Sequence, residues 1–409
     1  MSAAPVAITG LGVVGPHGDD AQAMFDALLR GESALRPVFP DLPRPAAAAM
    51  VDFDPARWFT KLQLVGVDRV SQLAVAAADL AVLDAGGLAG ADRERVGVYV
   101  GCGMGGAGAL DSAYRSGIAN GSGRVPPLTI PAFMPNAPAS HVAIRHGVLG
   151  PVLTYSVACA SSAIALAEAA KAVRSGEVDL AIAGGSEALI VPGVVMAWQA
   201  MQTLAPFAEG QAATAVKPFA ADRAGFALGE GAAFVVLESA QRAAARGARR
   251  YAGLSGWGVS SDATHLTKPD AAGQARALRH ALRVAGLSPA DVGYCNAHGT
   301  ATRVGDPVER DALARVWGEE GIERLRVSST KALHGHLLGA AGALEAVVTV
   351  LALHHRQVPP NAHVAQADPA CALNLVRPGD TQAPDLRAAV SNSFAFGGTN
   401  AALVFERAE

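Results

Sequence analysis

The sequence is poor in the residues that build metal sites and disulfide frameworks. Its 409 residues include four cysteines, which lie far apart and form no Cys-x-x-Cys pair: Cys102, Cys159, Cys295 and Cys371. This spacing argues against a structural zinc site or a disulfide scaffold. Charged residues make up only 17% of the chain and its net charge is −3. Because so small a charge attracts neither nucleic acid nor a membrane surface, we expect no partner of either kind.

The start of the chain also lacks the features of a secretory or membrane-spanning segment. Its first apolar run, residues 6–14, is interrupted by glycines and has no basic residues before it. Such a run is too short to cross a bilayer, so we expect a cytoplasmic protein. The chain does have 51% hydrophobic residues and 45 glycines. This composition predicts a large core with closely packed elements.

Short apolar runs alternate with helical patterns along the whole chain. Strands are expected at residues 6–14, 96–101, 151–158, 178–185, 232–238, 292–296, 326–329, 388–392 and 401–405. Helices are expected at residues 20–30, 70–84, 160–166, 239–250, 275–285, 306–316 and 339–355. Buried strands separated by helices are typical of α/β folds in which helices cover both faces of a sheet.

The pattern divides the chain into two similar halves, 1–250 and 251–409. Each half has a reactive loop after a strand, which suggests a structural duplication, and no proline-rich or serine-rich linker separates them. Gly10-Leu11-Gly12 raises the alternative of a dinucleotide site. The third glycine of that fingerprint is missing from its required place, and so is an acidic residue closing a second strand. We therefore expect no such cofactor.

Cys159 ends the apolar run 151–158 and precedes a segment of small residues typical of a helix start. A cysteine at such a corner presents its sulfur outward, and the positive end of the helix favours the thiolate. An activated nucleophile needs this arrangement. A buried structural cysteine is the alternative, and composition alone favours it.

A first histidine segment, residues 296–309, favours the nucleophile. It places His298, two threonines and two carboxylates in a predicted loop between a strand and a helix, where functional residues often lie. The structural alternative is a helix start in which Asp306 is the N-cap and Glu309, three residues later, completes a capping box.

A second segment, residues 328–342, places Lys331, His334 and His336 before a long apolar helix. The His-x-His pair raises metal binding as an alternative, but the sequence offers no nearby cysteine or matching third ligand. A histidine at a helix N-terminus is disfavoured as a cation. We therefore expect His336 to be neutral and to donate a hydrogen bond.

Four motifs in this order resemble those of the β-ketoacyl-acyl carrier protein synthases, and most closely the elongating type II enzymes of the thiolase superfamily. They are Cys159 in its small-residue context, Asn296-Ala297-His298-Gly299-Thr300, Lys331 with Gly335-His336, and Ser393-Phe394-Ala395-Phe396-Gly397-Gly398-Thr399-Asn400. Lys217-Pro218-Phe219, Asp222-Arg223-Ala224-Gly225-Phe226 and Gly229-Glu230-Gly231 match as well. The resemblance extends from the first strand to the C-terminus.

The resemblance implies an α/β, thiolase-like fold with five αβαβα layers, and no cofactor or metal beyond the phosphopantetheine that the substrates carry. It also implies a catalytic set of Cys159, His298 and His336. Cys159 takes an acyl group from an acyl carrier protein thioester. The histidines point N–H groups at the thioester oxygen of malonyl-carrier protein as it loses carbon dioxide. The product is a 3-oxoacyl-carrier protein.

Other roles follow from the same resemblance. Lys331 and Glu309 are expected to form a buried ion pair that orients the histidines. Thr300 and Thr302 match positions that hold the phosphopantetheine arm, and Phe396 matches a gating aromatic. The N–H of Cys159 and one from the Phe396 loop are expected to form an oxyanion hole.

The sequence departs from the family pattern around the acyl chain. Ala395 replaces the first glycine of the usual Gly-Phe-Gly-Gly loop, and His334 stands where threonine is more usual. Met104 and Trp198 occupy positions that are expected to line the acyl pocket. A tryptophan there would narrow the pocket or offer a flat wall to a rigid, unsaturated or aryl chain.

The function implied is therefore fatty-acid elongation, or alternatively polyketide or aryl-polyene synthesis with a chain-length-factor-like paralogue. A non-catalytic chain-length partner would lack the nucleophile. The presence of Cys159 therefore argues against this alternative. A degradative thiolase needs a second cysteine in a glycine-rich loop, and Cys371 has no such loop. An initiating synthase would use a Cys-His-Asn set, against which His336 argues.

The resemblance also implies a dimer, either a homodimer or a heterodimer with a ketosynthase-like paralogue, in which the sheet continues between subunits. Residues 142–157 are expected to supply that edge. Exposed basic groups should dock the carrier protein, and Lys61, Arg69 and Arg124 are candidates. The alternative for each is an ordinary solvated charge.

Overall fold

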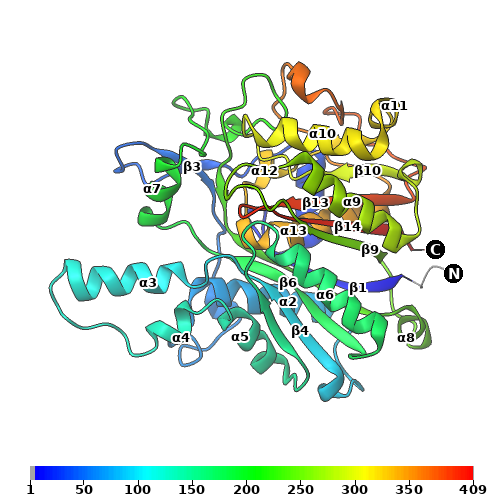
Figure 1. The fold of residues 1–409 in the computed structure, drawn as a ribbon. Coiled ribbons are helices and arrows are strands. Elements are labelled where there is room, and N and C mark those ends of the chain that lie inside the picture. The colour runs from blue at the N-terminus through cyan, green and yellow to red at the C-terminus, as the bar shows by residue number, and fades with distance from the viewer. Residues whose placement is uncertain (1–4, 409) are drawn as a thin grey trace.

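A computed structural model describes residues 5–408, whose strands form one long sheet made of two halves (Figure 1). The first half-sheet contains, in spatial order, β5 (Val152–Tyr155), β4 (Val96–Gly101), β6 (Leu180–Glu187), β8 (Gly231–Ser239) and β1 (Val6–Val14). The second contains β9 (Ala252–Ser261), β14 (Thr399–Arg407), β13 (Ala388–Phe394), β10 (Val292–Asn296), β11 (Arg326–Ser328) and β12 (Asn374–Leu375). The halves join where Val6 to Ile8 pair antiparallel with Ala252 to Leu254.

Three layers of helices cover the two half-sheets. The outer layer of the first half contains α2 (Arg69–Asp84) and α5 (Ala137–His146), and that of the second contains α9 (Ala271–Ala285) and α10 (Gly305–Trp317). The central layer contains α6 (Ser161–Ser175) and α13 (Ala341–His355), which pack between the half-sheets. The α/β, thiolase-like arrangement of five αβαβα layers is thus confirmed.

The duplication is visible in how strands contact helices. A Cβ on Gly10 would lie 2.2 Å from the carbonyl oxygen of Ala81 in α2, and a Cβ on Gly256 would lie 2.2 Å from that of Ala281 in α9. Glycine is needed at both sites because the helix backbone leaves no room for a side chain. The glycines of the Gly10-Leu11-Gly12 motif therefore allow β1 to pack closely against α2.

A smaller sheet and the remaining helices surround this core. The sheet contains β2 (Arg36–Val38), β3 (Ala46–Ala49) and β7 (Leu228–Gly229). The further helices are α1 (Ala21–Leu29), α3 (Ala107–Tyr114), α4 (Thr129–Phe133), α7 (Pro192–Ala200), α8 (Ala240–Ala245), α11 (Glu319–Ile322) and α12 (Lys331–His334). Figure 1 shows α3 and α4 projecting from one side of the body.

Three expectations about elements were wrong. Strand β9 was missed because its glycines and serines break the apolar pattern, although Gly256 and Gly258 are there to admit α9. Helix α8 stops at Ala245 instead of reaching 250, two residues before Gly247 takes a left-handed conformation. The expected edge segment 142–157 contains only one strand, β5. The first residues of that segment belong to helix α5.

One segment passes a membrane-span test by length and composition alone. Residues Leu338–His355, which include α13, have a mean hydropathy of 1.4. In the structure, 89% of this window is buried inside the protein. Its apolar sequence is explained by its place in the central layer, where both half-sheets cover it.

Candidate active site

The loop after β5 presents Cys159 at the start of the central helix α6. Ala158, just before it, has a φ of +46°, a left-handed conformation that a non-glycine residue adopts at a cost of about 1–3 kcal/mol. Small residues are required beneath this corner. A Cβ on Gly101 would lie 2.2 Å from the backbone nitrogen of Ser162. The expected strand-to-helix corner is therefore present.

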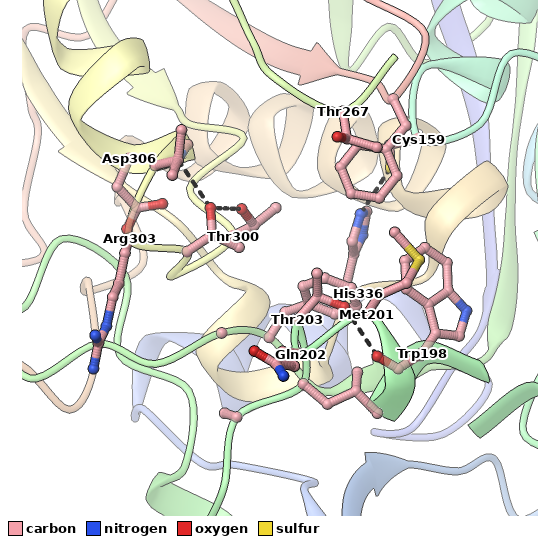
Figure 2. Close-up of a pocket in the computed structure, with 18 of the residues that line it drawn as sticks. Cys159, Trp198, Met201, Gln202, Thr203, Thr267, Thr300, Arg303, Asp306 and His336 are labelled. Atoms are coloured by element: carbon pink, nitrogen blue, oxygen red, sulfur yellow. Dashed lines mark hydrogen bonds between the residues drawn. The ribbon is translucent and has the colours of Figure 1, made fainter. Parts of the chain in front are cut away.

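His336 faces the sulfur from the other half of the molecule (Figure 2). Its Nε2 lies 3.1 Å from Cys159 Sγ, while its Nδ1 accepts the N–H of Leu338 at 3.3 Å. Because Nδ1 is an acceptor, the proton of the neutral ring is on Nε2. His336 therefore points a donor at the place where the chemistry would occur.

His298 completes the cluster from the loop after β10. Its ring centroid lies 5.4 Å from that of His336, and the ligand atoms of Cys159, His298 and His336 all lie within 4.8 Å of one another. The three side chains are buried. The structure thus brings together the three residues that the sequence singled out.

Glu309 holds the His298 loop through its backbone. Its carboxylate accepts the N–H groups of His298 and Gly299 at 2.8 and 2.7 Å, and the side-chain amide of Asn392 at 3.0 Å. Burial raises the pKa of Glu309, and these N–H groups oppose that shift. The capping-box alternative was wrong, because Thr302 Oγ1 accepts the N–H of Gly305 at the helix start and Glu309 binds the preceding loop.

The expected ion pair between Lys331 and Glu309 was also wrong. The ammonium of Lys331 pairs with Glu345 of α13, and both side chains are fully buried. Lys331 begins α12 and reaches Glu345 on α13, whereas the oxygens of Glu309 already accept hydrogen bonds from N–H groups. Burial raises the pKa of Glu345 to about 7, and Lys331 opposes the shift.

The protonation of the cluster follows from its burial. Burial, and secondarily the charge of Lys331, lowers the pKa of His298 and of His336 well below the ordinary value, so both rings are neutral. The expectation for His336 is confirmed, although burial is the main cause rather than a helix dipole. Burial raises the pKa of the Cys159 thiol to about 12. The expected thiolate is therefore not the resting form, since desolvation outweighs the helix terminus.

Two backbone N–H groups point at the same sulfur. Those of Phe396 and of Cys159 itself stabilise the thiolate and oppose the rise in its pKa. They are the pair expected for an oxyanion hole. N–H groups held in place by a folded backbone stabilise a developing negative charge without having to reorganise.

A cavity of about 800 Å³ leads to the cluster. Cys159, His298 and His336 line it together with the expected Thr300, Thr302, Trp198 and Phe396. The hydroxyls of Thr300 and Thr302 lie 3.2 Å apart, and Figure 2 shows Thr300 and Arg303 across the cavity from Cys159. Met104 is not part of this lining and is 46% exposed, so its expected place in the cavity wall was wrong.

Comparison with known families decides what this arrangement is. The N-terminal domain of β-ketoacyl synthases matches residues 3–243, and their C-terminal domain matches residues 251–365. This chain belongs to the β-ketoacyl synthase family. It is therefore an enzyme, a condensing acyltransferase.

The synthase resembles relatives along its whole length. It is 40% identical over 407 residues to Nodulation protein E of Rhizobium sp. (strain N33), covering 98% of this chain and 99% of the relative. It is 37% identical over 411 residues to 3-oxoacyl-[acyl-carrier-protein] synthase 2 of Staphylococcus aureus (strain N315), covering 99% and 98%. Among solved structures, the ishigamide ketosynthase/chain length factor superposes with a TM-score of 0.91 at 31% identity, covering 99% of each chain.

An aromatic group narrows the synthase cavity beside the nucleophile. The rings of Trp198 and Phe396 stack with centroids 6.0 Å apart, and Trp198 meets Phe226 edge-on at 5.5 Å. Phe226 in turn lies edge-on to His336 at 5.3 Å. The expected gating aromatic is thus braced by the tryptophan that departs from the family pattern.

Sequence reasoning assigned no role to Glu345, Asn392 or Phe226, although Phe226 lies in one of the matching motifs. Glu345 had a readable signal, because a single carboxylate interrupts the otherwise uncharged helix segment 341–353 and must find a buried partner. Asn392 ends the expected strand 388–392, and no local pattern marks it as a site residue. Its contact with Glu309 depends on how β13 lies beside β10.

The His-x-His pair is not a metal-ligand pair in the synthase. The ring nitrogens of His334 contact the carbonyl oxygen of Gly335 at 2.7 Å and Thr330 Oγ1 at 2.8 Å. The residues placed to hold a metal ion are instead Cys159, His298 and His336. A soft thiolate and two imidazoles suit zinc, but the sulfur is also the nucleophile of the site.

Proposed function

We propose that the synthase performs decarboxylative Claisen condensation: it joins an acyl chain on Cys159 to malonyl-acyl carrier protein and yields a 3-oxoacyl-acyl carrier protein. The observation that carries this proposal is the sulfur of Cys159 facing the Nε2 donor of a neutral His336, beside a neutral His298, in a cavity. The acyl carrier protein named in the S. aureus relative supports the choice of substrate carrier.

In the first half-reaction, the thiol of Cys159 attacks the carbonyl of an acyl thioester. The new C–S bond forms, the pantetheine C–S bond breaks, and the departing thiol takes the proton of Cys159. Negative charge on the carbonyl oxygen is stabilised by the N–H groups of Cys159 and Phe396. An acyl-cysteine remains.

In the second half-reaction, malonyl thioester occupies the cavity and its C–C bond to the carboxylate breaks. Carbon dioxide leaves, and the electron pair moves to the thioester oxygen as an enolate. Neutral imidazoles suit this step because each N–H stabilises the enolate without adding a charge to a buried site. The enolate carbon then forms a bond to the acyl carbonyl, the acyl C–S bond breaks, and the departing thiolate of Cys159 takes a proton from water.

The carrier protein requires cations at the cavity mouth. Arg44, Lys268 and Arg303 are exposed and line the cavity, so we propose that they bind the phosphate of the pantetheine arm and acidic groups around it. Of the candidates from the sequence, Arg69 is already engaged within the chain. Its guanidinium pairs with Glu230 at 2.7 Å and donates to Val51 O at 2.6 Å. Lys61 and Arg124 are exposed and stay candidates.

We also propose that the synthase acts as a dimer through β5. This strand ends the first half-sheet, and Val152 and Leu153 on it are 38% and 45% exposed. An apolar strand at an open edge pairs readily with another chain. Ile130 and Ile144, 63% and 77% exposed on α4 and α5, extend the apolar surface. The partner is a second copy or a ketosynthase-like paralogue, as the ketosynthase/chain length factor neighbour suggests.

A second candidate for the pathway is polyketide or aryl-polyene synthesis, which the stacked rings of Trp198 and Phe396 favour over saturated fatty-acid elongation. A flat wall beside the nucleophile accommodates a conjugated or aryl chain by stacking. A flexible saturated chain gains less from such a surface.

Intact-mass analysis after exposure to acyl-carrier protein thioesters tests the proposal. The panel contains saturated, polyunsaturated and aryl-conjugated chains, and malonyl-carrier protein is added afterwards. We expect an acyl adduct on Cys159 that disappears as a 3-oxoacyl-carrier protein forms. Extension of saturated chains assigns fatty-acid elongation, and loading confined to conjugated or aryl chains assigns the second candidate. If no chain loads, even after a paralogous partner is supplied, the proposed function is wrong.

A further inference from the structure

A second buried carboxylate, Glu187, lies behind the active site and is not used in the reaction as described. It ends β6 and is fully buried. Its Oε2 accepts the N–H of Gly103 at 2.8 Å and that of Gly339 at 2.9 Å, and its Oε1 accepts the N–H of Met104 at 3.3 Å. The carboxylate thus joins two segments that are far apart in sequence.

The surroundings of Glu187 are shaped to its carboxylate. A Cβ on Gly103 or on Gly339 would lie 2.5 Å from Oε2, and a Cβ on Gly339 would also lie 2.3 Å from the backbone nitrogen of Gly103. Both positions therefore require glycine. Backbone N–H groups rather than a cation stabilise the carboxylate. The charged form of Glu187 is therefore favoured only while the two loops hold these N–H groups in place.

A short chain of contacts links Glu187 to the nucleophile. Gly339 follows Leu338, which has a φ of +46°, a conformation that a leucine keeps only where the surroundings impose it. In that conformation the N–H of Leu338 reaches Nδ1 of His336. The Nε2 of the same ring faces Cys159 Sγ. The hydrogen bond from Gly339 to Glu187 is the anchor of this series.

We propose that Glu187 is a positioning residue for the condensation: by anchoring Gly339 it holds Leu338 left-handed, so that His336 keeps its Nε2 proton pointed at the reacting thioester. This proposal rests on the proposed function, because it assigns His336 the role of an enolate-stabilising donor. It adds that a carboxylate outside the cavity determines which nitrogen of His336 carries the proton.

Glu187→Gln tests the proposal, because the amide keeps the size of the side chain but leaves only one oxygen to accept N–H groups. We expect malonyl decarboxylation to fall about tenfold, the effect of losing one buried hydrogen bond to a charged group. Acylation of Cys159 should change less than about threefold, since it uses the N–H groups of Cys159 and Phe396. Equal losses in both steps, or no loss, would overturn the proposal.

Glu238→Gln is the matched control. Glu238 is another buried carboxylate, on the neighbouring strand β8, where it accepts hydrogen bonds from Thr9 and Arg246 away from the cavity. Its loss should lower stability without separating decarboxylation from acylation. If Glu238→Gln separates the two steps as Glu187→Gln does, the effect is generic and the proposal is wrong.

The wild-type enzyme supplies a measurement that does not depend on a variant folding. The ¹⁵N shifts of the His336 ring should report a protonated Nε2 and a bare Nδ1. Burial raises the pKa of Glu187 to about 7. As the pH falls, the carboxylate is therefore protonated, and one of its two oxygens no longer accepts backbone N–H groups as a charged acceptor. Decarboxylation should therefore decline from about pH 8 to about pH 6. Glu187→Gln should weaken this decline, and the part that remains belongs to Glu345, whose pKa is also about 7.

The group that faces Glu187 does not titrate in that range. Cys102 Sγ lies 4.0 Å from Oε1, and burial raises the pKa of its thiol well above the ordinary value. A protonated Nδ1 on His336 in the wild type would overturn the proposal that Glu187 positions His336.

The failure of the proposed function would be a different result: the wild type would then neither load acyl chains nor release carbon dioxide from malonyl-carrier protein.

Discussion

In the first half of the molecule, β1 lays Gly12 against α2 so that an added Cβ would lie 2.0 Å from the carbonyl oxygen of Ala77. In the second half, β9 lays Gly258 against α9 so that an added Cβ would lie 1.9 Å from that of Ala277. The scaffold is thus repeated in detail at its outer faces. At the inner loops the halves differ. The first half supplies the nucleophile Cys159, and the second supplies His298 and His336.

This difference teaches how a duplicated fold acquires a compound active site. The glycine contacts are present in both copies, because a side chain at either strand position would meet a helix carbonyl oxygen. The loops at the ends of the central helices differ between the halves and carry the reactive side chains, although they are buried as well. We therefore expect variants to separate the contributions of the halves.

The largest effect is expected for Cys159→Ala. Without the nucleophile of the first half, condensation should fall at least about a thousandfold. Release of carbon dioxide from malonyl-carrier protein, which uses the second half, should stay within about tenfold of wild type. Intact mass and carbon dioxide release measure the two. Cys371→Ala, a buried cysteine that does not line the cavity, is the control; an acyl adduct on the Cys159→Ala protein would contradict the assignment.

The next effect concerns the buried ion pair of the second half. Glu345→Gln should lower the free energy of unfolding by about 3–5 kcal/mol, because it leaves the ammonium of Lys331 buried without a negatively charged partner. A double-mutant cycle with Lys331→Met, followed by denaturant unfolding, measures the coupling. The same cycle with Glu309→Gln should give a coupling below about 1 kcal/mol. A larger coupling to Glu309 than to Glu345 would refute the pairing.

A smaller effect tests whether the halves are equivalent as scaffolds. Gly12→Ala and Gly258→Ala should each destabilise by about 3 kcal/mol, because the added methyl group meets a helix carbonyl oxygen. Gly293→Ala is the control, since its Cβ would meet only the side chain of Leu386 at 3.1 Å. Thermal unfolding measures all three. If one of the two glycines tolerates alanine, the repeat is not equally tight in the two halves.

The last prediction concerns the pH dependence of Cys159 itself and needs no variant. Because the pKa of its thiol is about 12, the reactive thiolate is scarce at neutral pH and its fraction rises with pH. Alkylation of Cys159 should therefore accelerate by about tenfold per pH unit between about pH 6 and pH 9. Peptide mass mapping separates it from the other cysteines. A plateau near neutral pH would show that the helix terminus outweighs burial after all.

Residue patterns were sufficient for most strands, and the resemblance of four motifs to a known family implied the catalytic cluster. β1, β4 and β10 have the predicted bounds, because short apolar runs between helices leave no other placement. Strand β9 was missed because its glycines serve a contact with α9 that no local pattern reveals. Met104 was wrongly expected in the cavity wall, because the exposure of a loop residue depends on which distant segments pack over that loop.

The sequence by itself determined the layered α/β fold and the identity of Cys159, His298 and His336. Apolar periodicity and side-chain chemistry are properties of single segments. Only the tertiary structure decided that Lys331 pairs with Glu345, that His336 carries its proton on Nε2, and that Glu187 bridges two loops. Those features depend on distances between segments far apart in the chain, and on a burial that shifts each pKa only after the layers have closed.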